Sequence, residues 1–388
     1  MEISACVKYV GVNDNQVDLF EGQYKVPNGM SYNSYVILDE KIAVMDTVDG
    51  FFTEEWLNNV EQVLGGKMPD YLVIQHMEPD HSASIPAFLK KYPKATVVST
   101  AKGFQFMEQF FPEFFAGQGL PAEQRIVAAN DGVLELGQHS LHFVYAPMVH
   151  WPEVMMTYEA TEKILFAADG FGKFGALDVE EEWTDEARRY YIGIVGKYGP
   201  QVQAVLKKVA GLDIWTICSL HGPVLKENLG FYLEKYDRWS SYQPEESGVV
   251  IAYASVYGNT RSAAEYLADV LQEKGQKTVL YDLARCDKAK AVADAFRYDR
   301  LVLAGITYNG DLFPCMRSFI EGLTERNYQN RKVAIIENGT WAPMAGKLIL
   351  GMFEKSKNLT FTETTVSIKS AMNEQKKGEI GKLAQELS

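Results

Sequence analysis

The sequence contains little cysteine, and its cysteines are scattered. Among 388 residues there are only four, Cys6, Cys218, Cys286 and Cys315, and no two of them form a CxxC pair. This usage argues against a disulfide framework, a zinc ribbon and a cysteine-ligated iron–sulfur centre. Basic residues are fewer than acidic ones, 38 against 51, which gives a formal net charge of −13. Because phosphate binding requires a basic surface, nucleic acid is not expected as a partner.

Long apolar runs are also missing. No uninterrupted stretch approaches the ~20 residues that a membrane span needs, so no membrane partner is expected. The N-terminal residues Met1–Ala5 carry neither the basic nor the apolar region of a secretory signal. With 47% hydrophobic and 23% charged residues, the composition is that of a globular protein. The length suits two domains of ~100–200 residues each, and we expect a cytoplasmic protein.

The clearest boundary signal is the polar segment 240–248, which contains Pro244 and ends in Gly248. After it, short apolar segments alternate with segments of helical spacing. Strands are predicted at 249–254, 277–281, 300–304, 332–337 and 361–366, and helices at 259–274, 288–297, 313–325, 342–355 and 374–387. This alternation predicts an α/β domain over 248–388, a doubly wound parallel sheet with helices on both faces.

The pattern before the boundary is different. Strands are predicted at 32–38, 41–46, 71–75, 95–98 and 213–218, with a run of short strands over 124–167. Helices are predicted at 53–64, from 82, from 101 and through most of 184–242. Strand-rich halves with interspersed helices favour a two-sheet α/β sandwich over 1–243.

A hexapeptide with two of the six histidines directly follows the strand predicted at 71–75. It reads His76-Met77-Glu78-Pro79-Asp80-His81. Pro79 biases Glu78 toward an extended conformation, and residues two apart in an extended chain share a side. His76 and Glu78 can then reach one metal ion, while Asp80 and His81 turn toward a second. Imidazole and carboxylate without thiolate suit iron or manganese better than structural zinc.

The alternative for the hexapeptide is a solvated turn that leads to a helix capped by Ser82. Three further ligand-type residues, His150, Asp169 and His221, each follow another predicted strand. Four strand ends with such residues favour a metal site over a solvated turn. His139 and His142 are interpreted as structural, because they flank a strand without a carboxylate at ligand spacing.

A second motif, Ser255-Val256-Tyr257-Gly258-Asn259-Thr260, joins the strand at 249–254 to the next helix. Hydroxyls and backbone N–H groups at a helix N-terminus form an anion site, and glycine lets the chain approach a phosphate closely. The string resembles the phosphate loop of flavodoxins. No Walker A lysine follows it, which disfavours a nucleoside triphosphatase.

Two more loops follow the strands at 300–304 and 332–337, where a doubly wound sheet binds its ligand. Tyr308 and Trp341 could be surface aromatics, but beside the phosphate loop they favour contact with a planar isoalloxazine ring. No GxGxxG follows a strand, so no NAD(P)H site is expected. The expected cofactor-binding residues are Ser255, Val256, Tyr257, Gly258, Asn259, Thr260, Thr307, Tyr308, Asn309, Gly310, Asn338, Gly339, Thr340 and Trp341.

Taken together and in this order, the motifs resemble those of flavodiiron proteins over the whole chain. The resemblance implies an N-terminal αββα metallo-β-lactamase-like sandwich and a C-terminal flavodoxin-like domain. It further implies a diiron centre, in which one iron is held by His76, Glu78 and His150, the other by Asp80, His81 and His221, and Asp169 bridges the two. Hydrolases of the superfamily have histidine where this chain has Glu78, and a carboxylate there favours iron.

The resemblance also implies a function, the reduction of dioxygen to water, of nitric oxide to nitrous oxide, or both, in protection against oxidative or nitrosative stress. Electrons would enter through FMN from an external carrier such as rubredoxin, and the cysteine count argues against a rubredoxin domain in this chain. In the family the FMN and metal loops lie at distant ends of one chain. A head-to-tail homodimer, or a dimer of dimers, would bring FMN of one subunit to the irons of the other.

Two other functions remain open from the sequence. One is a metal-dependent hydrolase of the metallo-β-lactamase type fused to a flavodoxin-like electron-transfer domain, against which Glu78 argues. The other is a flavodoxin-type electron carrier with an N-terminal docking module, against which the complete set of ligand-type residues argues. Measuring the metal and flavin content per chain distinguishes these two functions from that of a flavodiiron reductase.

Overall fold

The computed structural model describes residues 3–116 and 120–388. It divides into two compact units, which we call the first unit (Met1–Tyr191 and Pro200–Asp237) and the second unit (Ile192–Gly199 and Arg238–Ser388). The segment Ile192–Gly199 thus belongs to the second unit, although its neighbours on both sides in the sequence belong to the first.

Two sheets form the centre of the first unit. Within the described residues, one sheet has the order β1 (Val7–Tyr9), β6 (Tyr35–Ile37), β7 (Ala43–Met45), β8 (Tyr71–Val73), β9 (Thr96–Ser99) and β10 (Arg125–Val127). The other has the order β11 (Val133–Glu135), β12 (Ser140–Tyr145), β13 (Met155–Glu159), β14 (Ile164–Phe166) and β15 (Thr216–Cys218). The pairs from β7 to β10 are parallel, and so is β14 with β15.

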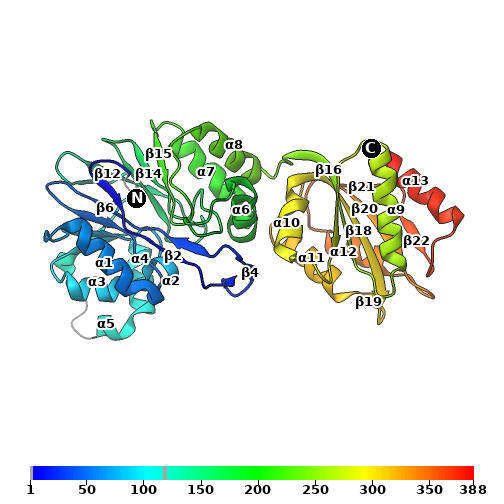
Figure 1. Ribbon diagram of the computed structural model, residues 1–388, viewed down its shortest axis with the longest axis horizontal. Helices are drawn as coiled ribbons and strands as arrows, with labels where there is room; N and C mark the ends of the chain where they lie inside the picture. Colours follow the sequence, from blue (N-terminus) through cyan, green and yellow to red (C-terminus); the bar gives the residue numbers. More distant parts are fainter. Residues whose placement is uncertain (1–2, 117–119) are drawn as a thin grey trace. The chain divides into compact units, whose positions relative to one another are not determined.

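The inner faces of the two sheets form one hydrophobic core. Val7 and Ile37 of the first sheet belong to the same buried cluster as Phe143 and Phe166 of the second. Helices α1 (Thr53–Leu64), α3 (Ile85–Lys91) and α4 (Ala101–Phe110) lie on one side of the sheets, and α7 (Gly199–Val209) and α8 (Leu229–Ser240) lie on the other (Figure 1). The first unit is therefore the predicted αββα sandwich.

The spacing of apolar residues explains how these helices attach. In α1 the buried residues are Trp56, Val60 and Leu64, one per turn on a single face. Gly65 ends the helix with a φ of 56°, a left-handed conformation that glycine adopts without steric cost. Helix α1 has the bounds that the sequence pattern predicts.

The second unit is built on a parallel sheet. Its main strands have the order β17 (Thr278–Asp282), β16 (Glu246–Tyr253), β18 (Tyr298–Tyr308), β20 (Arg331–Asn338) and β21 (Leu359–Phe361). Numbered along the chain this is the order 2-1-3-4-5 of flavodoxin-like sheets. The predicted fold class, a metallo-β-lactamase-like sandwich followed by a flavodoxin-like sheet, is confirmed.

The strand predicted at 361–366 is wrong in detail, because two short strands take its place. Strand β21 pairs with the beginning of β20, and β22 (Val366–Ile368) pairs with its end. Between them the backbone N–H groups of Glu363 and Thr364 donate to the carboxylate of Glu386 instead of to β20. The last residue of helix α13 (Glu374–Glu386) thus satisfies the N–H groups of the break between the two strands.

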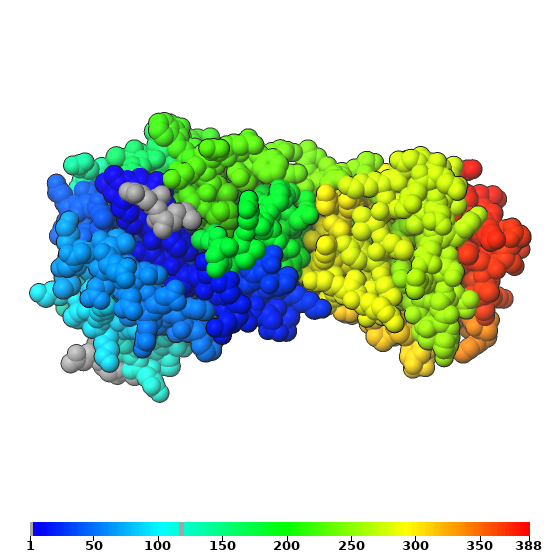
Figure 2. Space-filling view, in the orientation of Figure 1, coloured from blue at the N-terminus to red at the C-terminus, as the bar shows by residue number. Residues whose placement is uncertain are grey.

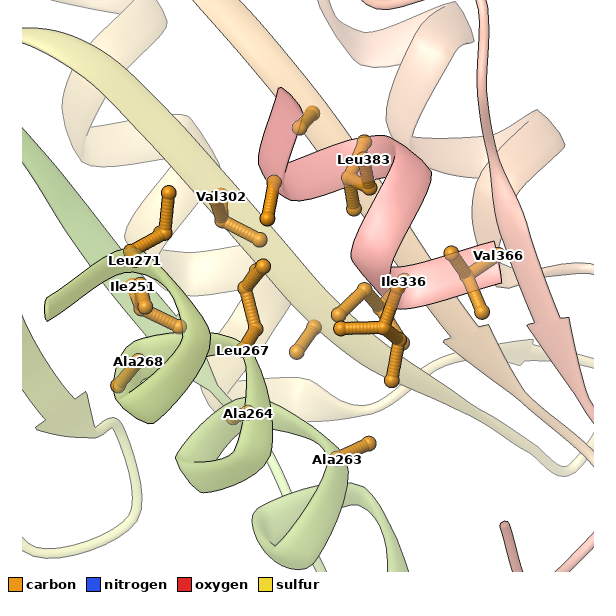
Figure 3. Close-up of a cluster of buried hydrophobic side chains, with 14 of the residues drawn as sticks. Ile251, Ala263, Ala264, Leu267, Ala268, Leu271, Val302, Ile336, Val366 and Leu383 are labelled. Carbon is orange, nitrogen blue, oxygen red and sulfur yellow. The ribbon is translucent and has the colours of Figure 1, made fainter. Parts of the chain in front are cut away.

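Helices cover both faces of this sheet. On one face, Leu267 and Leu271 of α9 (Asn259–Glu273) and Leu383 of α13 (Glu374–Glu386) pack on Val302 and Ile336 of the sheet (Figure 3). The side chains of α9 (yellow-green) and α13 (red) lie side by side on the surface of this unit (Figure 2). The other face carries α10 (Lys288–Arg297), α11 (Pro314–Thr324) and α12 (Ala345–Met352).

Among the helices of the described residues, none has both the length and the apolar character that crossing a membrane requires.

Candidate dimetal centre and flavin site

The predicted metal ligands lie in loops and one short helix that follow strands of the sandwich. His76 and Glu78 follow β8, and Glu78 is extended, with φ −59° and ψ 138°. Asp80 and His81 lie in the short helix α2 (Pro79–Ser82). Where one helix from about 82 was predicted, the structure has α2, which begins at Pro79, whose missing N–H costs no hydrogen bond in the first turn, and then α3, which begins after Ser84.

The other three candidate ligands come from the second sheet. His150 lies in the turn between β12 and β13, Asp169 follows β14, and His221 follows β15. Strands β14 and β15 are parallel, so the residues after their carboxyl ends reach the same edge of the sheet. All three side chains are buried.

The first group of ligand-type residues consists of His76, Glu78, His150 and Asp169. Nε2 of His150 lies 3.1 Å from Oε2 of Glu78 and 3.0 Å from Oδ2 of Asp169. Nε2 of His76 lies 3.3 Å from the same Glu78 oxygen and 3.4 Å from the same Asp169 oxygen. Two imidazoles and two carboxylates therefore converge on one point.

The second group consists of Asp80, His81 and His221. The Nε2 atoms of the two histidines face each other at 3.0 Å, and each lies 3.3 Å from Oδ2 of Asp80. Oδ1 of Asp169 completes the group, 3.3 Å from Nε2 of His81 and 3.8 Å from Nε2 of His221. The imidazole of His81 is thus directed into the group.

Asp169 joins the two groups. Its Oδ2 faces the first group and its Oδ1 faces the second. Within the part of the chain that the structure describes, Oδ1 of Asp169 and both carboxylate oxygens of Asp80 are buried without a hydrogen-bond donor. Buried carboxylate oxygens are costly unless a donor or a cation satisfies them. The donor set of imidazoles and carboxylates therefore fits two metal ions of the iron or manganese type.

A cavity of about 590 Å³ lies at the carboxyl ends of β16, β18 and β20 in the second unit. Every predicted cofactor-binding residue except Gly258 lines it. Gly258 instead precedes the first residue of α9, with a φ of 91° that favours glycine. The hydroxyl of Ser255 accepts a hydrogen bond from the Gly258 N–H, which holds the loop against the helix N-terminus.

The rim of the cavity carries aromatic rings. Tyr257 is 92% exposed, Trp341 is 89% exposed and Tyr308 is 48% exposed. Exposed rings beside a cavity can stack on a planar ligand. Thr307 holds two of the loops together, because its hydroxyl accepts hydrogen bonds from the N–H groups of Met344 and Ala345. Four further residues line the cavity outside the predicted set, namely Ile306, Ala342, Met344 and Ser370.

Both units have known counterparts. A family model described as ODP family beta lactamase matches residues 30–222, and a flavodoxin domain model matches residues 250–360. An anaerobic nitric oxide reductase flavorubredoxin of Vibrio vulnificus is 28% identical over 349 residues, which cover 86% of this chain and 69% of that protein. An uncharacterized protein of Methanocaldococcus jannaschii is 28% identical over 326 residues, 82% of this chain and 80% of that protein.

Solved structures match the entire chain. Rubredoxin oxygen:oxidoreductase from Desulfovibrio gigas has a TM-score of 0.92 at 24% identity, covering 100% of this chain and 97% of that one. The flavodiiron protein from Giardia intestinalis has a TM-score of 0.87 at 25% identity, covering 100% of this chain and 96% of that one. The chain belongs to the flavodiiron protein family. As predicted, it is an oxidoreductase whose cofactors are FMN and a diiron centre.

Several residues that support the candidate metal ligands could not be predicted from local spacing. Oε1 of Glu153 lies 2.8 Å from Nδ1 of His76 and accepts a hydrogen bond from the Met77 N–H. Nδ1 of His221 lies 2.7 Å from the carbonyl oxygen of Ser31. Such contacts fix which ring nitrogen of each histidine faces the metal position. In the local sequence, this role of Glu153 is indicated only by its position shortly after His150.

A further carboxylate holds the loop before the hexapeptide. Asp46 is fully buried and accepts hydrogen bonds from the backbone and side-chain N–H groups of Gln75. Burial raises the pKa of Asp46 to about 6, although these hydrogen bonds act in the opposite direction. Asp46 thus fixes the chain directly before His76.

The carboxylates of the candidate dimetal centre stabilise the protonated, positively charged form of His150. Burial opposes protonation of His150, but hydrogen bonds to Asp169 and Glu78 outweigh it and raise the pKa of His150 to about 9. Burial likewise opposes ionisation of Asp169, yet His76 and the other histidines hold the pKa of this carboxyl well below its usual range. An electrostatic environment of this kind attracts cations.

The two remaining histidines differ from each other. His142 contacts the hydroxyl of Ser140 at 3.2 Å. His139 is buried, and its ring lies between two carboxylates from distant parts of the sequence, Asp39 at 2.8 Å and Glu162 at 3.4 Å. Local spacing could not predict the carboxylates beside His139, because both of them come from distant parts of the sequence.

Proposed function

We propose that this flavodiiron protein reduces dioxygen to water, nitric oxide to nitrous oxide, or both, with FMN and a diiron centre as its cofactors. The observation that carries the proposal is the position of Asp169, whose two carboxylate oxygens face two separate groups of ligand-type residues. The names of two relatives support it, one a nitric oxide reductase flavorubredoxin and the other a rubredoxin oxygen:oxidoreductase.

In this proposal each residue of the centre has a positioning role. His76, Glu78 and His150 would hold one iron, Asp80, His81 and His221 the other, and Asp169 would bridge them. Glu153 and the Ser31 carbonyl would orient His76 and His221 through their Nδ1 atoms. Burial of these ligands, apart from the partly exposed Glu78, keeps bulk water from competing for the metal positions.

The second unit would bind FMN in its cavity. The backbone N–H groups at the N-terminus of α9 would receive the phosphate, and the loops at 307–310 and 338–341 would receive the ring system. When bound, iron and FMN together hold the four electrons that reduction of dioxygen to water takes, and reduction of two nitric oxide molecules takes two. The protein's own contribution is to hold, orient and shield these groups.

The electron source and the assembly are further parts of the proposal. An external carrier such as rubredoxin would reduce FMN, and a head-to-tail homodimer or a dimer of dimers would bring FMN of one subunit to the irons of another. We also expect a cytoplasmic location and a role in protection against oxidative or nitrosative stress. Light scattering on the active species tests the assembly, and an active monomer would contradict it.

The experiment that tests the proposed function combines measurements of iron and FMN content with measurements of dioxygen and nitric oxide turnover. The purified protein should contain two irons and one FMN per chain, consume dioxygen without releasing hydrogen peroxide, and convert nitric oxide to nitrous oxide when FMN is reduced. Zinc in place of iron together with esterase activity would instead support a hydrolase. Flavin cycling that does not depend on iron would support an electron carrier.

A further inference from the structure

A second cluster of ligand-type side chains lies in the first unit, apart from the diiron ligands. Cys6 precedes β1 and Asp39 follows β6, so both flank strands of the six-stranded sheet. His139 precedes β12, and Glu162 lies between β13 and β14, so both flank strands of the other sheet. The cluster therefore connects the two sheets of the sandwich.

The cluster lies at the opposite end of the strands from the diiron ligands. Glu162 lies before β14 (Ile164–Phe166) and Asp169 beyond its end, and likewise His139 lies before β12 (Ser140–Tyr145) and His150 beyond its end. Strand β14, whose three residues span roughly 10 Å, therefore lies between Glu162 and Asp169. The second cluster is thus a separate site.

The ligand atoms of the cluster are close enough to share one cation. The sulfur of Cys6, a ring nitrogen of His139 and a carboxylate oxygen of Glu162 all lie within 4.8 Å of one another. In a tetrahedral zinc site, with Zn–S of about 2.3 Å and Zn–N or Zn–O of about 2.0 Å, neighbouring ligand atoms are about 3.3–3.6 Å apart. Small rotations of these side chains would reach that geometry.

Asp39 orients the imidazole of the cluster. Its Oδ2 lies 2.8 Å from Nδ1 of His139 and also accepts a hydrogen bond from the His139 backbone N–H at 2.7 Å. Nε2 of the ring is thereby directed toward Glu162, at 3.4 Å. A carboxylate on one ring nitrogen, with the other nitrogen directed at the ligand position, is the usual arrangement of metal-binding histidines.

The charge around the cluster also favours a cation. Glu159 is fully buried beside it, held by the backbone N–H groups of Thr161 and Glu162. Together with Asp39 and the Glu162 side chain it surrounds the thiol and the imidazole with three carboxylates. Burial and the charges of Glu162 and Asp39 raise the pKa of the Cys6 thiol, so the thiol keeps its proton until a cation displaces it.

We propose that Cys6, His139 and Glu162 bind a zinc ion that links the two sheets of the first unit. Zinc binding replaces the S–H bond of Cys6 with an S–Zn bond and the Nε2–H bond of His139 with an N–Zn bond, and it releases both protons to solvent. Asp39 acts as a positioning residue through His139, and water takes the fourth coordination position. One thiolate distinguishes this site from the diiron centre, whose ligand groups contain no sulfur.

The test uses the iron- and FMN-loaded protein, equilibrated with one equivalent of zinc chloride after removal of adventitious metal. Zinc content is measured together with zinc X-ray absorption, which identifies a sulfur neighbour. We expect one zinc per chain with a single Zn–S contact near 2.3 Å and no loss of iron. Zinc uptake only at the expense of iron, or without a sulfur neighbour, would overturn the proposal.

Two variants identify the ligands. Cys6→Ser should lose the sulfur signal and weaken zinc binding at least tenfold, and Asp39→Asn should weaken it while keeping the Zn–S contact. The matched control is Cys286→Ser, which replaces a half-buried thiol in the second unit and should bind zinc like the unaltered protein. Unchanged zinc affinity in Cys6→Ser would leave the cluster as a structural ion pair between His139 and its carboxylates.

Discussion

Glu153 and His76 are joined by a contact of 2.8 Å between Oε1 of the carboxylate and Nδ1 of the ring. Both side chains are buried, so the ring cannot turn without breaking this contact inside the protein. The opposite ring nitrogen, Nε2, is thereby held toward Glu78 and Asp169. The position of one proposed iron ligand thus depends on a residue that is not itself a ligand.

Replacing Glu153 should therefore weaken metal binding without removing a ligand. We expect Glu153→Ala to lower iron affinity about 10–100-fold, the usual effect of losing an orienting partner. Glu153→Gln, whose carbonyl oxygen can still accept both hydrogen bonds, should have a smaller effect. Iron retained against a competing chelator measures this, with Glu123→Gln at an exposed position as the control. Equal iron retention in Glu153→Ala would show that the contact does not orient His76.

The bridging role of Asp169 can be tested separately from the flavin site. Asp169→Asn keeps the size of the side chain but removes the negative charge shared by the two groups. We expect fewer than one iron per chain and loss of reoxidation by either gas, with FMN content unchanged. His142→Gln, outside both groups, serves as the control. Two tightly bound irons in the Asp169→Asn protein would contradict the bridging assignment.

Removing an aromatic ring from the rim of the flavin cavity should lower flavin affinity without unfolding the protein. Trp341 is 89% exposed, so truncation leaves no cavity in the core. We expect Trp341→Ala to raise the FMN dissociation constant about tenfold, because ring stacking contributes ~1–3 kcal/mol. The melting temperature of the flavin-free protein should stay the same. Trp215→Ala, which removes a 60% exposed ring from the first unit, is the matched control and should leave FMN affinity unchanged.

The lining of the flavin cavity predicts an unusual response to salt. Among the described residues that line it, none carries a charged side chain, so the FMN phosphate would be bound by neutral donors. With a net charge of −13, the protein repels an anionic ligand at long range, and salt screens that repulsion. We therefore expect FMN affinity to stay constant or rise as sodium chloride increases. A tenfold loss of affinity would reveal a cationic phosphate contact.

Much of the fold follows from local patterns. Helix α1 begins at Thr53 and ends at Leu64 as predicted, because its apolar spacing and the glycine after it are both local signals. The break between β21 and β22 could not be predicted, because its backbone N–H groups donate to the carboxylate of Glu386, which belongs to another element. Local sequence thus predicts regular elements well, and long-range contacts change their ends.

The same distinction applies to the candidate sites. The two candidate metal groups divide the hexapeptide, with His76 and the extended Glu78 in one, and Asp80 and His81 of helix α2 in the other. The partners of these ligands come from elsewhere in the chain, as Glu153 does for His76. Spacing along the chain therefore reveals candidate ligands, but not the residues that orient them.

The most direct test of the proposed function is stopped-flow mixing of the fully reduced, iron- and FMN-loaded protein with dioxygen and, separately, with nitric oxide. We predict rapid return of the oxidised flavin absorbance with at least one of the two gases, no hydrogen peroxide, and loss of the rapid phase in the Asp169→Asn protein. Slow reoxidation that releases peroxide, at the same rate in iron-free protein, would contradict a reductase built on the diiron centre.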